Sequence, residues 1–382
     1  MTNKGALAGL TVLDLSRLLP GPFCSMILSD HGARVIAIED KRFASEAGAN
    51  AGVYRNKKHM TLNLKKETGR KIFLEMARQA DIILEGFRPG VTRRLGVDYD
   101  TVSQINPKII YCSITGYGQT GPYRDTVGHD VNYLSIAGVL DLIGVKDGPP
   151  CIPGIQIADM AGGALYAVVG ILMALHARET TGRGQYIDIS MTDGSMSLLT
   201  LVLSLTKLTG RPARRSDSFL SHRYACYHVY ETADHRYLSI GAVENRFWKT
   251  ICDYFNVPEY IPLQYDEARR QEIFDFMENQ FRQKTLSEWE LELADLEICW
   301  APVRTVDEAM ASELFKAREM VVEIRDEKGH DSKGIGTPVK LSDTPGSVRT
   351  PPPGFGENTK EILRSFGYSN DSIKEWEASG VI

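Results

Sequence analysis

The first 115 residues alternate between two hydrophobic patterns. Short, continuous apolar runs, typical of buried strands, occupy residues 12–15, 33–38, 60–64, 82–84 and 109–113. Residues 23–29 and 67–80 show helical spacing instead, the latter as a charged amphipathic helix. Strands that alternate with helices predict an α/β fold with a mostly parallel sheet covered on both faces.

A long apolar stretch, residues 160–175, follows Asp159 and contains Gly162 and Gly163. It is shorter than the roughly 20 residues that a membrane span needs, and Asp159 and His176 bracket it. We interpret it as a helix buried inside the protein. Residues 185–190 then alternate as one further strand, and residues 195–208 predict a connecting helix.

The pattern changes at Tyr224. Residues 227–231 and 237–240 predict a hairpin, and amphipathic helices are expected near residues 247–255, 266–282 and 286–296. Beyond Val322 the chain is rich in Gly and Pro until a final helix at residues 358–366. We expect a large domain (1–195), a linker helix and loop (196–223), a smaller α+β domain (224–320) and a C-terminal segment that returns to the large domain (321–382).

Composition narrows the possible partners. The 382 residues carry a formal net charge of −5, dispersed along the chain, which disfavours a nucleic-acid or anionic-membrane partner. The six cysteines are scattered without a Cys-x-x-Cys pair, so we expect neither a metal site nor disulfides. We expect reduced thiols and a cytoplasmic location.

Three polar residues before the long apolar stretch have side chains that could take part in catalysis. His129 and Asp130 precede one predicted helix, and Asp159 precedes another. A His and an Asp at two helix starts suit proton transfer at carbon or carboxylate attack on an acyl group. Taken singly, His129 is more often a capping or core histidine, and Asp159 is more often an ordinary N-cap residue.

Basic residues recur at the carboxyl ends of the predicted strands, among them Lys41, Arg42, Lys65 and Arg88. These ends share one edge of a parallel sheet, so the cations could converge on a phosphate-bearing ligand. The first turn lacks both Gly-x-Gly-x-x-Gly and Gly-Lys-Ser/Thr, which disfavours a nicotinamide dehydrogenase. Glu39, at a strand end, could hold a ribose or simply be an acidic surface residue.

Five segments between residues 7 and 365 resemble the family III CoA-transferase (CaiB/BaiF) and 2-methylacyl-CoA racemase superfamily. They are residues 14–24 (DLSRLLPGPFC), 86–90 (GFRPG), 115–122 (TGYGQTGP), 128–133 (GHDVNY) and 182–185 (GRGQ). The resemblance implies a Rossmann-like large domain, a smaller α+β domain and an interlocked ring-like homodimer. It implies coenzyme A as part of the substrate, with no permanently bound cofactor. By the same resemblance, coenzyme A would contact Lys41, Arg42, Leu62, Lys65, Gly86, Phe87, Arg88, Arg94 and Arg124.

The superfamily divides by chemistry. In its transferases the residue matching Asp159 attacks the acyl-CoA thioester; in its racemases the matching Asp and a His, here His129, flank the α-carbon. Glu244 matches a glutamate that orients that histidine, and Asp130 would hold the opposite carboxylate or nearby backbone. Two departures from the racemase pattern are Asn245, where the racemases have Pro, and residues 221–223, where they have Gly-Gly.

We therefore predict epimerisation at C2 of a 2-methyl-branched acyl-CoA, with His129 and Asp159 as the acid/base pair. The alternative is CoA transfer between carboxylic acids through Asp159. A third reading is a non-catalytic nucleotide-binding protein. We expect backbone N–H groups of residues 160–162 to face the thioester oxygen, with Gly162 and Gly163 permitting its close approach.

Overall fold

The computed structural model describes residues 5–46, 51–325 and 331–382, which form two compact units. Unit 1 comprises Met1–Gly138, Pro153–Leu198 and Glu313–Ile382, and unit 2 comprises Val139–Ile152 and Leu199–Ser312. The predicted boundaries differ at three places. Residues 313–320, predicted in the small domain, belong to unit 1, whereas most of the predicted linker and the segment 139–152 both belong to unit 2. Arg215 joins these two segments by donating to the Asp141 carbonyl at 2.7 Å and carboxylate at 2.8 Å, a pairing that no sequence pattern reveals.

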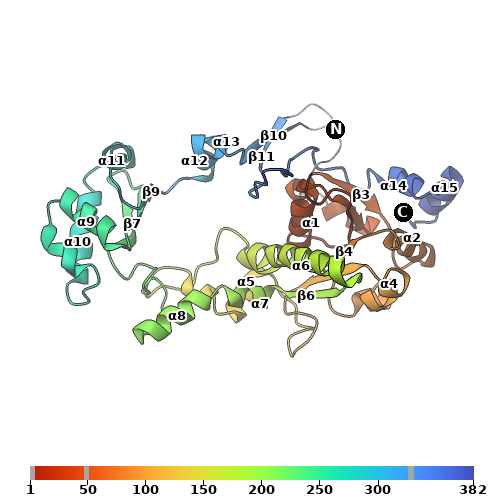
Figure 1. The fold of residues 1–382 in the computed structure, drawn as a ribbon, viewed down its shortest axis with the longest axis horizontal. Coiled ribbons are helices and arrows are strands. Elements are labelled where there is room, and N and C mark those ends of the chain that lie inside the picture. The colour runs from red at the N-terminus through yellow and green to blue at the C-terminus, as the bar shows by residue number, and fades with distance from the viewer. Residues whose placement is uncertain (1–4, 47–50, 326–330) are drawn as a thin grey trace. The chain divides into compact units, whose positions relative to one another are not determined.

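A six-stranded parallel sheet forms the centre of unit 1 (Figure 1). Its strands are β1 (Thr11–Asp14), β2 (Arg34–Glu39), β3 (Lys57–Thr61), β4 (Ile82–Glu85), β5 (Ile110–Thr115) and β6 (Tyr186–Ser190). Their order is β3-β2-β1-β4-β5-β6, and every neighbouring pair is parallel. The order reverses between β1 and β4, where a sheet of this kind opens a crevice at its carboxyl edge.

Helices cover both faces of this sheet. Leu13, Ile36 and Ile83 face a core shared with helices from the N- and C-terminal parts of the chain. Those helices are α2 (Glu67–Ala77), α4 (Tyr99–Ile105), α14 (Thr359–Ser365) and α15 (Asn370–Ala378). On the other face, α1 (Pro20–Asp30) and α6 (Tyr166–Thr181) pack on the strands, and Gly170 of α6 lies close to Ile187. The predicted α/β class is confirmed.

The apolar stretch after Asp159 is one helical segment of 24 residues, Ala158–Thr181, that begins as a π-helix (Ala158–Leu165) and continues as α6. The prediction of a buried helix is wrong for much of its length: only 39% of its most apolar window is buried, and Met173 is 67% exposed. The segment is long and apolar enough to cross a membrane. A single such helix is weak evidence of a span, since core helices of soluble proteins pass the same test.

Unit 2 is built on a three-stranded antiparallel sheet, β7 (Tyr227–Glu231), β8 (Tyr237–Gly241) and β9 (Trp300–Pro302), which confirms the predicted hairpin. Its longer helices are α8 (Thr200–Thr209), α9 (Asn245–Tyr254), α10 (Arg270–Phe281) and α11 (Leu286–Leu293). Trp248 and Trp289 are fully buried in its core. The helix predicted at 195–208 is divided into α7 (Met191–Ser197) in unit 1 and α8 in unit 2.

The remaining elements are short. They are α3 (Val91–Leu95), α5 (Asp130–Ile136), α12 (Val306–Ala311), α13 (Glu313–Ala317), the strands β10 (Val321–Arg325) and β11 (Asp331–Ile335), and the 3₁₀ turns Lys41–Glu46, Ala51–Tyr54, Leu140–Leu142 and Pro258–Leu263. The C-terminal segment lies against the N-terminal part of unit 1 beside a buried ion pair, Asp30–Arg55. There the side chains of Asn56 and Arg349 both donate to the Ser347 carbonyl. This supports the predicted return of the chain to the large domain.

Candidate active site

A cavity of about 750 Å³ lies in unit 1 at the carboxyl edge of the sheet. It is lined by the turns that follow β1, β4 and β5, by the first residue of α7, and by the start of α5. His129 and Asp159 both line it, with Gly86, Phe87, Arg88 and Arg124. The crevice that parallel sheets leave at a topological switch point therefore holds the two residues predicted as the acid/base pair.

The Gly-His-Asp-x-Asn-Tyr motif fixes His129 at the start of α5. His129 is the N-cap residue with extended backbone, and its N–H donates to Asn132 Oδ1 at 3.0 Å. Tyr133 packs beneath the turn, where its hydroxyl donates to the Gly128 carbonyl, and a Cβ at Gly128 would lie 2.8 Å from its ring. The motif thus presents an exposed imidazole on a turn held by its neighbours.

Asp130 connects the two predicted catalytic residues. Its Oδ2 accepts the backbone N–H of Asp159 at 3.0 Å, and the residue is only 9% exposed. This contact agrees with the expectation that Asp130 holds nearby backbone. Through this hydrogen bond Asp130, the residue after His129, connects the start of α5 to the segment that carries Asp159.

Asp159 is a half-buried acid with a perturbed pKa. Its pKa is raised from 3.8 to about 6: burial is the largest cause, the Asp130 carboxylate adds to the rise, and His129 opposes it. The influence of both neighbours indicates that the three side chains lie close together. A carboxyl with a pKa near neutrality can exchange a proton readily with a substrate at physiological pH.

The helix start differs from the prediction in two respects. Asp159 is the second residue of a π-helix, a form that is frequent at functional sites, and Ile157 is its N-cap. The N–H of Met160 donates to the Gln156 carbonyl at 3.0 Å, so this group is not available to a thioester oxygen. Of the predicted N–H groups, those of Ala161 and Gly162 stay predictions.

The two glycines of the π-helix serve helix packing. A Cβ at Gly162 would lie 2.6 Å from the Met191 carbonyl oxygen, and one at Gly194 would lie 2.0 Å from the Gly162 carbonyl oxygen. A Cβ at Gly163 would lie 2.8 Å from the Met191 side chain. The prediction that these glycines give room to the thioester is therefore wrong, since α7 fills that space.

The nine predicted coenzyme A contacts divide into two groups. Gly86, Phe87, Arg88 and Arg124 line the cavity, and the other five lie elsewhere on unit 1. Those five are Lys41, Arg42, Leu62, Lys65 and Arg94; all are exposed at the surface except Leu62. The Leu62 side chain is buried in the core, and its N–H donates to the Glu39 carbonyl.

Sequence reasoning missed three residues of this site. Leu18 lines the cavity in the left-handed region at φ 65°, and it is 54% exposed. Such a backbone is uncommon for a leucine and is typical of functional turns. Arg17, beside it, pairs with Glu39 at 3.1 Å. Glu85, directly before Gly86, is almost completely buried.

Glu39 does not present a free carboxylate for a ribose. Its oxygens are paired with Arg17, with the Tyr54 hydroxyl at 2.9 Å and with His59 Nε2 at 3.2 Å. These hydrogen bonds lower its pKa despite the opposing effect of burial. The ligand reading of Glu39 loses support accordingly.

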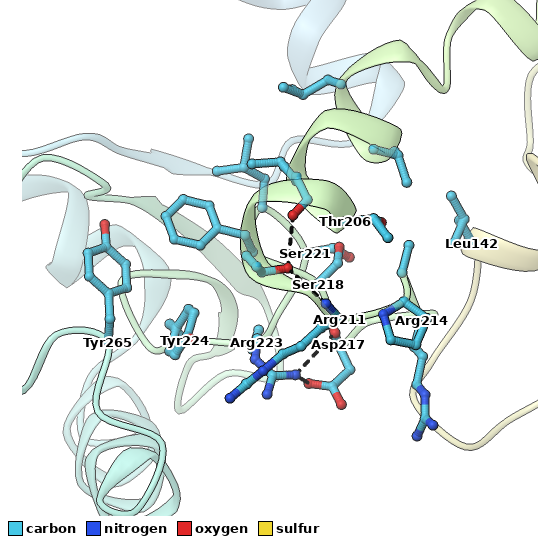
Figure 2. Close-up of a pocket in the computed structure, with 18 of the residues that line it drawn as sticks. Leu142, Thr206, Arg211, Arg214, Asp217, Ser218, Ser221, Arg223, Tyr224 and Tyr265 are labelled. Atoms are coloured by element: carbon cyan, nitrogen blue, oxygen red, sulfur yellow. Dashed lines mark hydrogen bonds and ion pairs between the residues drawn. The ribbon is translucent and has the colours of Figure 1, made fainter.

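Glu244 belongs to unit 2, where it is the exposed N-cap residue of α9. Unit 2 has a cavity of its own, about 470 Å³, lined by apolar residues of α8 and by the segment that follows it (Figure 2). There Arg223 pairs with Asp217 at 2.9 Å, while Tyr224 and Tyr265 line one side. The orienting role of Glu244 stays a prediction.

The family model "CoA-transferase family III" matches residues 7–359. The chain belongs to this family. The relatives similar to this chain are named for two different chemistries. This chain is 34% identical to an "Acyl-CoA transferase" of Fusarium pseudograminearum over 410 residues, covering all of this chain and 89% of the relative. It is 32% identical to an "Alpha-methylacyl-CoA racemase" of Homo sapiens, covering 99% of this chain and 97% of that one.

A solved structure supports the same assignment. The "CAIB/BAIF family protein from Brucella suis" superimposes with a TM-score of 0.82 at 28% identity, covering 95% of this chain and all of that chain. The resemblance on which the sequence analysis rested is therefore confirmed, and so is the conclusion that the protein is an enzyme of the racemase or CoA-transferase type.

Proposed function

We propose that the protein transfers a proton at C2 of a 2-methyl-branched acyl-CoA, with His129 and Asp159 as the two bases. The observation that carries this proposal is that both residues line one cavity and are linked through Asp130. Coenzyme A would lie along Gly86, Phe87 and Arg88, with Arg88 and Arg124 offering charge to its phosphates. Lys41, Arg42, Leu62, Lys65 and Arg94 stay predicted contacts.

The chemical step balances with one proton shared by the pair. The unprotonated base removes the C2 proton, and the electron pair moves onto the thioester oxygen as an enolate. The other base, already protonated, delivers its proton to the opposite face of C2, and the enolate collapses to the epimer. A pKa of about 6 allows Asp159 to act in either role near neutral pH.

The alternative is CoA transfer through Asp159 as nucleophile. Its carboxylate would attack the thioester carbonyl and expel the CoA thiolate, giving a mixed anhydride. The thiolate would then attack the Asp159 carbonyl carbon, giving an enzyme-bound thioester and releasing the first acid. The exposure of Asp159 to the cavity suits this step too, and one relative is named as an acyl-CoA transferase.

Solvent exchange at C2 separates the two reactions. In D₂O with a 2-methylacyl-CoA, the wild type should incorporate deuterium at C2, and His129→Asn should lose epimerisation by at least about a hundredfold. His176→Asn is the matched control, since that histidine is 85% exposed on α6, and it should react at the wild-type rate. No exchange in the wild type, together with an acyl-enzyme trapped by hydroxylamine, would establish the transferase instead. Coenzyme A binding that survives Asp159→Ala, with no activity in the wild type to lose, would indicate a non-catalytic binding protein.

We also propose a homodimer. Five exposed apolar residues recur at helical spacing along one side of the Ala158–Thr181 segment and form a stripe: Leu165, Tyr166, Val169, Leu172 and Met173. An apolar face of this kind is typical of a protein interface. In such an assembly Glu244 could orient His129 from the same or the partner subunit. A cytoplasmic location agrees with six cysteines that are all unpaired thiols.

A further inference from the structure

Glu85 occupies the position just before the loop that lines the cavity. It is the last residue of β4, is 2% exposed, and precedes Gly86, Phe87 and Arg88. Its Oε2 accepts the backbone N–H of Phe87 at 2.7 Å. The carboxyl therefore closes a tight turn two residues long at the point where the strand ends.

The far side of the carboxyl is held by the next two strands. Ser113 of β5 lies directly opposite Glu85 in the sheet, and its hydroxyl lowers the pKa of the Glu85 carboxyl. The Tyr186 hydroxyl of β6 donates in turn to Ser113 Oγ at 2.9 Å. The Glu85 carboxyl thus lies between the Phe87 N–H, which it accepts, and the neighbouring strand, where Tyr186 holds the Ser113 hydroxyl.

The Glu85 side chain is buried and readily protonated, so a glutamine side chain resembles it closely. Its pKa is raised from 4.5 to about 7: burial is the largest cause, the Ser113 hydroxyl and the Phe87 N–H oppose the rise, and Asp188 adds to it. Its field also raises the pKa of Tyr111, Cys112 and Tyr186. At neutral pH the group is therefore neutral for much of the time, as a glutamine side chain always is.

We propose that Glu85 is a positioning residue for coenzyme A, which holds the backbone of Gly86, Phe87 and Arg88 at the cavity through the Phe87 N–H. This rests on the proposed function, in which that loop contacts coenzyme A. A loop ordered before binding loses less conformational entropy when the ligand arrives. Glu85 acts on binding, since the loop is predicted to meet the coenzyme A moiety and the chemistry occurs at C2.

Two substitutions at Glu85 test the proposal by calorimetric titration with coenzyme A. Glu85→Leu leaves the Phe87 N–H without its acceptor, and we expect the Kd for coenzyme A to rise about tenfold. The kcat for C2 proton exchange should stay within about twofold. Glu85→Gln keeps the acceptor, so its Kd should stay within about twofold of the wild type.

Asp81 provides a matched control at the opposite edge of the sheet. Its Oδ2 accepts the Thr11 N–H at 2.9 Å, a side-chain contact to a backbone N–H just before β4 begins, and its Oδ1 pairs with Arg178 at 3.1 Å. Asp81→Leu should lower the melting temperature without changing the Kd. An equal rise in Kd for Asp81→Leu and Glu85→Leu, or an unchanged Kd for Glu85→Leu, would overturn the proposal.

A second variant decides the question if Glu85→Leu does not fold. Ser113→Ala removes the support of the carboxyl while leaving Glu85 and Phe87 in place, and its Kd should rise about threefold. An unchanged Kd in this variant would reject the positioning role. If the wild type itself does not bind coenzyme A, the proposed function fails, an outcome distinct from the failure of Glu85 as a positioning residue.

Discussion

Replacing Asp130 by asparagine tests how much this neighbouring carboxylate contributes to the raised pKa of Asp159. The change removes one negative charge beside Asp159 but keeps a side-chain oxygen that can accept the Asp159 N–H, now 3.0 Å from Asp130 Oδ2. The pKa of Asp159 is raised from 3.8 to about 6, mainly by burial and in part by the Asp130 carboxylate. Without this neighbouring charge the ionised form of Asp159 is favoured, so its pKa falls.

The size of the fall follows from the ranking of the causes. The total rise is about 6 minus 3.8, or roughly two pKa units, and burial is its largest cause. We therefore assign about half a unit to one unit to Asp130, which is ordinary for a carboxylate neighbour. Most of the perturbation should survive in the variant.

The assay is the pH profile of kcat/KM, which reports the pKa of the free enzyme. If ionised Asp159 is the required base, the acid limb of the wild type lies near pH 6. It should move down by about half a unit to one unit in Asp130→Asn. Asp100→Asn, at a surface ion pair with Arg93, should leave the limb unchanged. An acid limb that stays in place or moves up in Asp130→Asn would refute the reasoning.

Three further outcomes concern stability and assembly. Gly194→Ala should destabilise unit 1 by about 2 kcal/mol or more in thermal unfolding, because the added Cβ would clash with the Gly162 carbonyl. Gly154→Ala should leave the stability unchanged, since there is open space around Gly154. Arg55→Met should lower the free energy of unfolding in urea by about 3 to 5 kcal/mol, because it leaves the buried Asp30 carboxylate without its paired guanidinium. Arg93→Met, at the exposed pair with Asp100, should lower it by less than about 1 kcal/mol. Met173→Glu, in the apolar stripe of the Ala158–Thr181 segment, should convert the proposed dimer to a monomer in light scattering, whereas Leu291→Glu should not. A wild type that is monomeric alone but binds lipid vesicles would contradict the assignment of the stripe to a dimer interface.

The sheet and the convergence of His129 with Asp159 could be predicted because both depend on local signals. Continuous apolar runs identify buried parallel strands, and motif spacing set both residues at helix starts. The burial of the helix after Asp159 could not be predicted in this way. Its apolar residues run all around the helix, so periodicity does not say which face the protein covers, and Met173 stays exposed.

The roles of the glycines were misassigned for a related reason. Gly162 and Gly194 lie 32 positions apart, and only their meeting in space shows that each removes a side chain from the same helix contact. From sequence alone, a glycine pair beside a candidate catalytic acid is equally compatible with room for a substrate. The choice between the two readings needs the position of α7.

Four acids at this edge of the sheet look alike in the sequence, yet the structure distinguishes them by what their oxygens bind. Asp14 accepts the Ser16 N–H, Glu85 accepts the Phe87 N–H and Asp130 accepts the Asp159 N–H, so each holds a turn of the backbone. Asp159 differs, because within the described part of the chain its carboxylate has no hydrogen-bond donor and lines the cavity. Burial is the largest cause of its raised pKa of about 6, which under the proposed function suits proton exchange near neutral pH. The carboxylates of Asp14, Glu85 and Asp130 are therefore engaged by backbone N–H groups, and that of Asp159 faces the cavity, where the proposed function needs a reactive group.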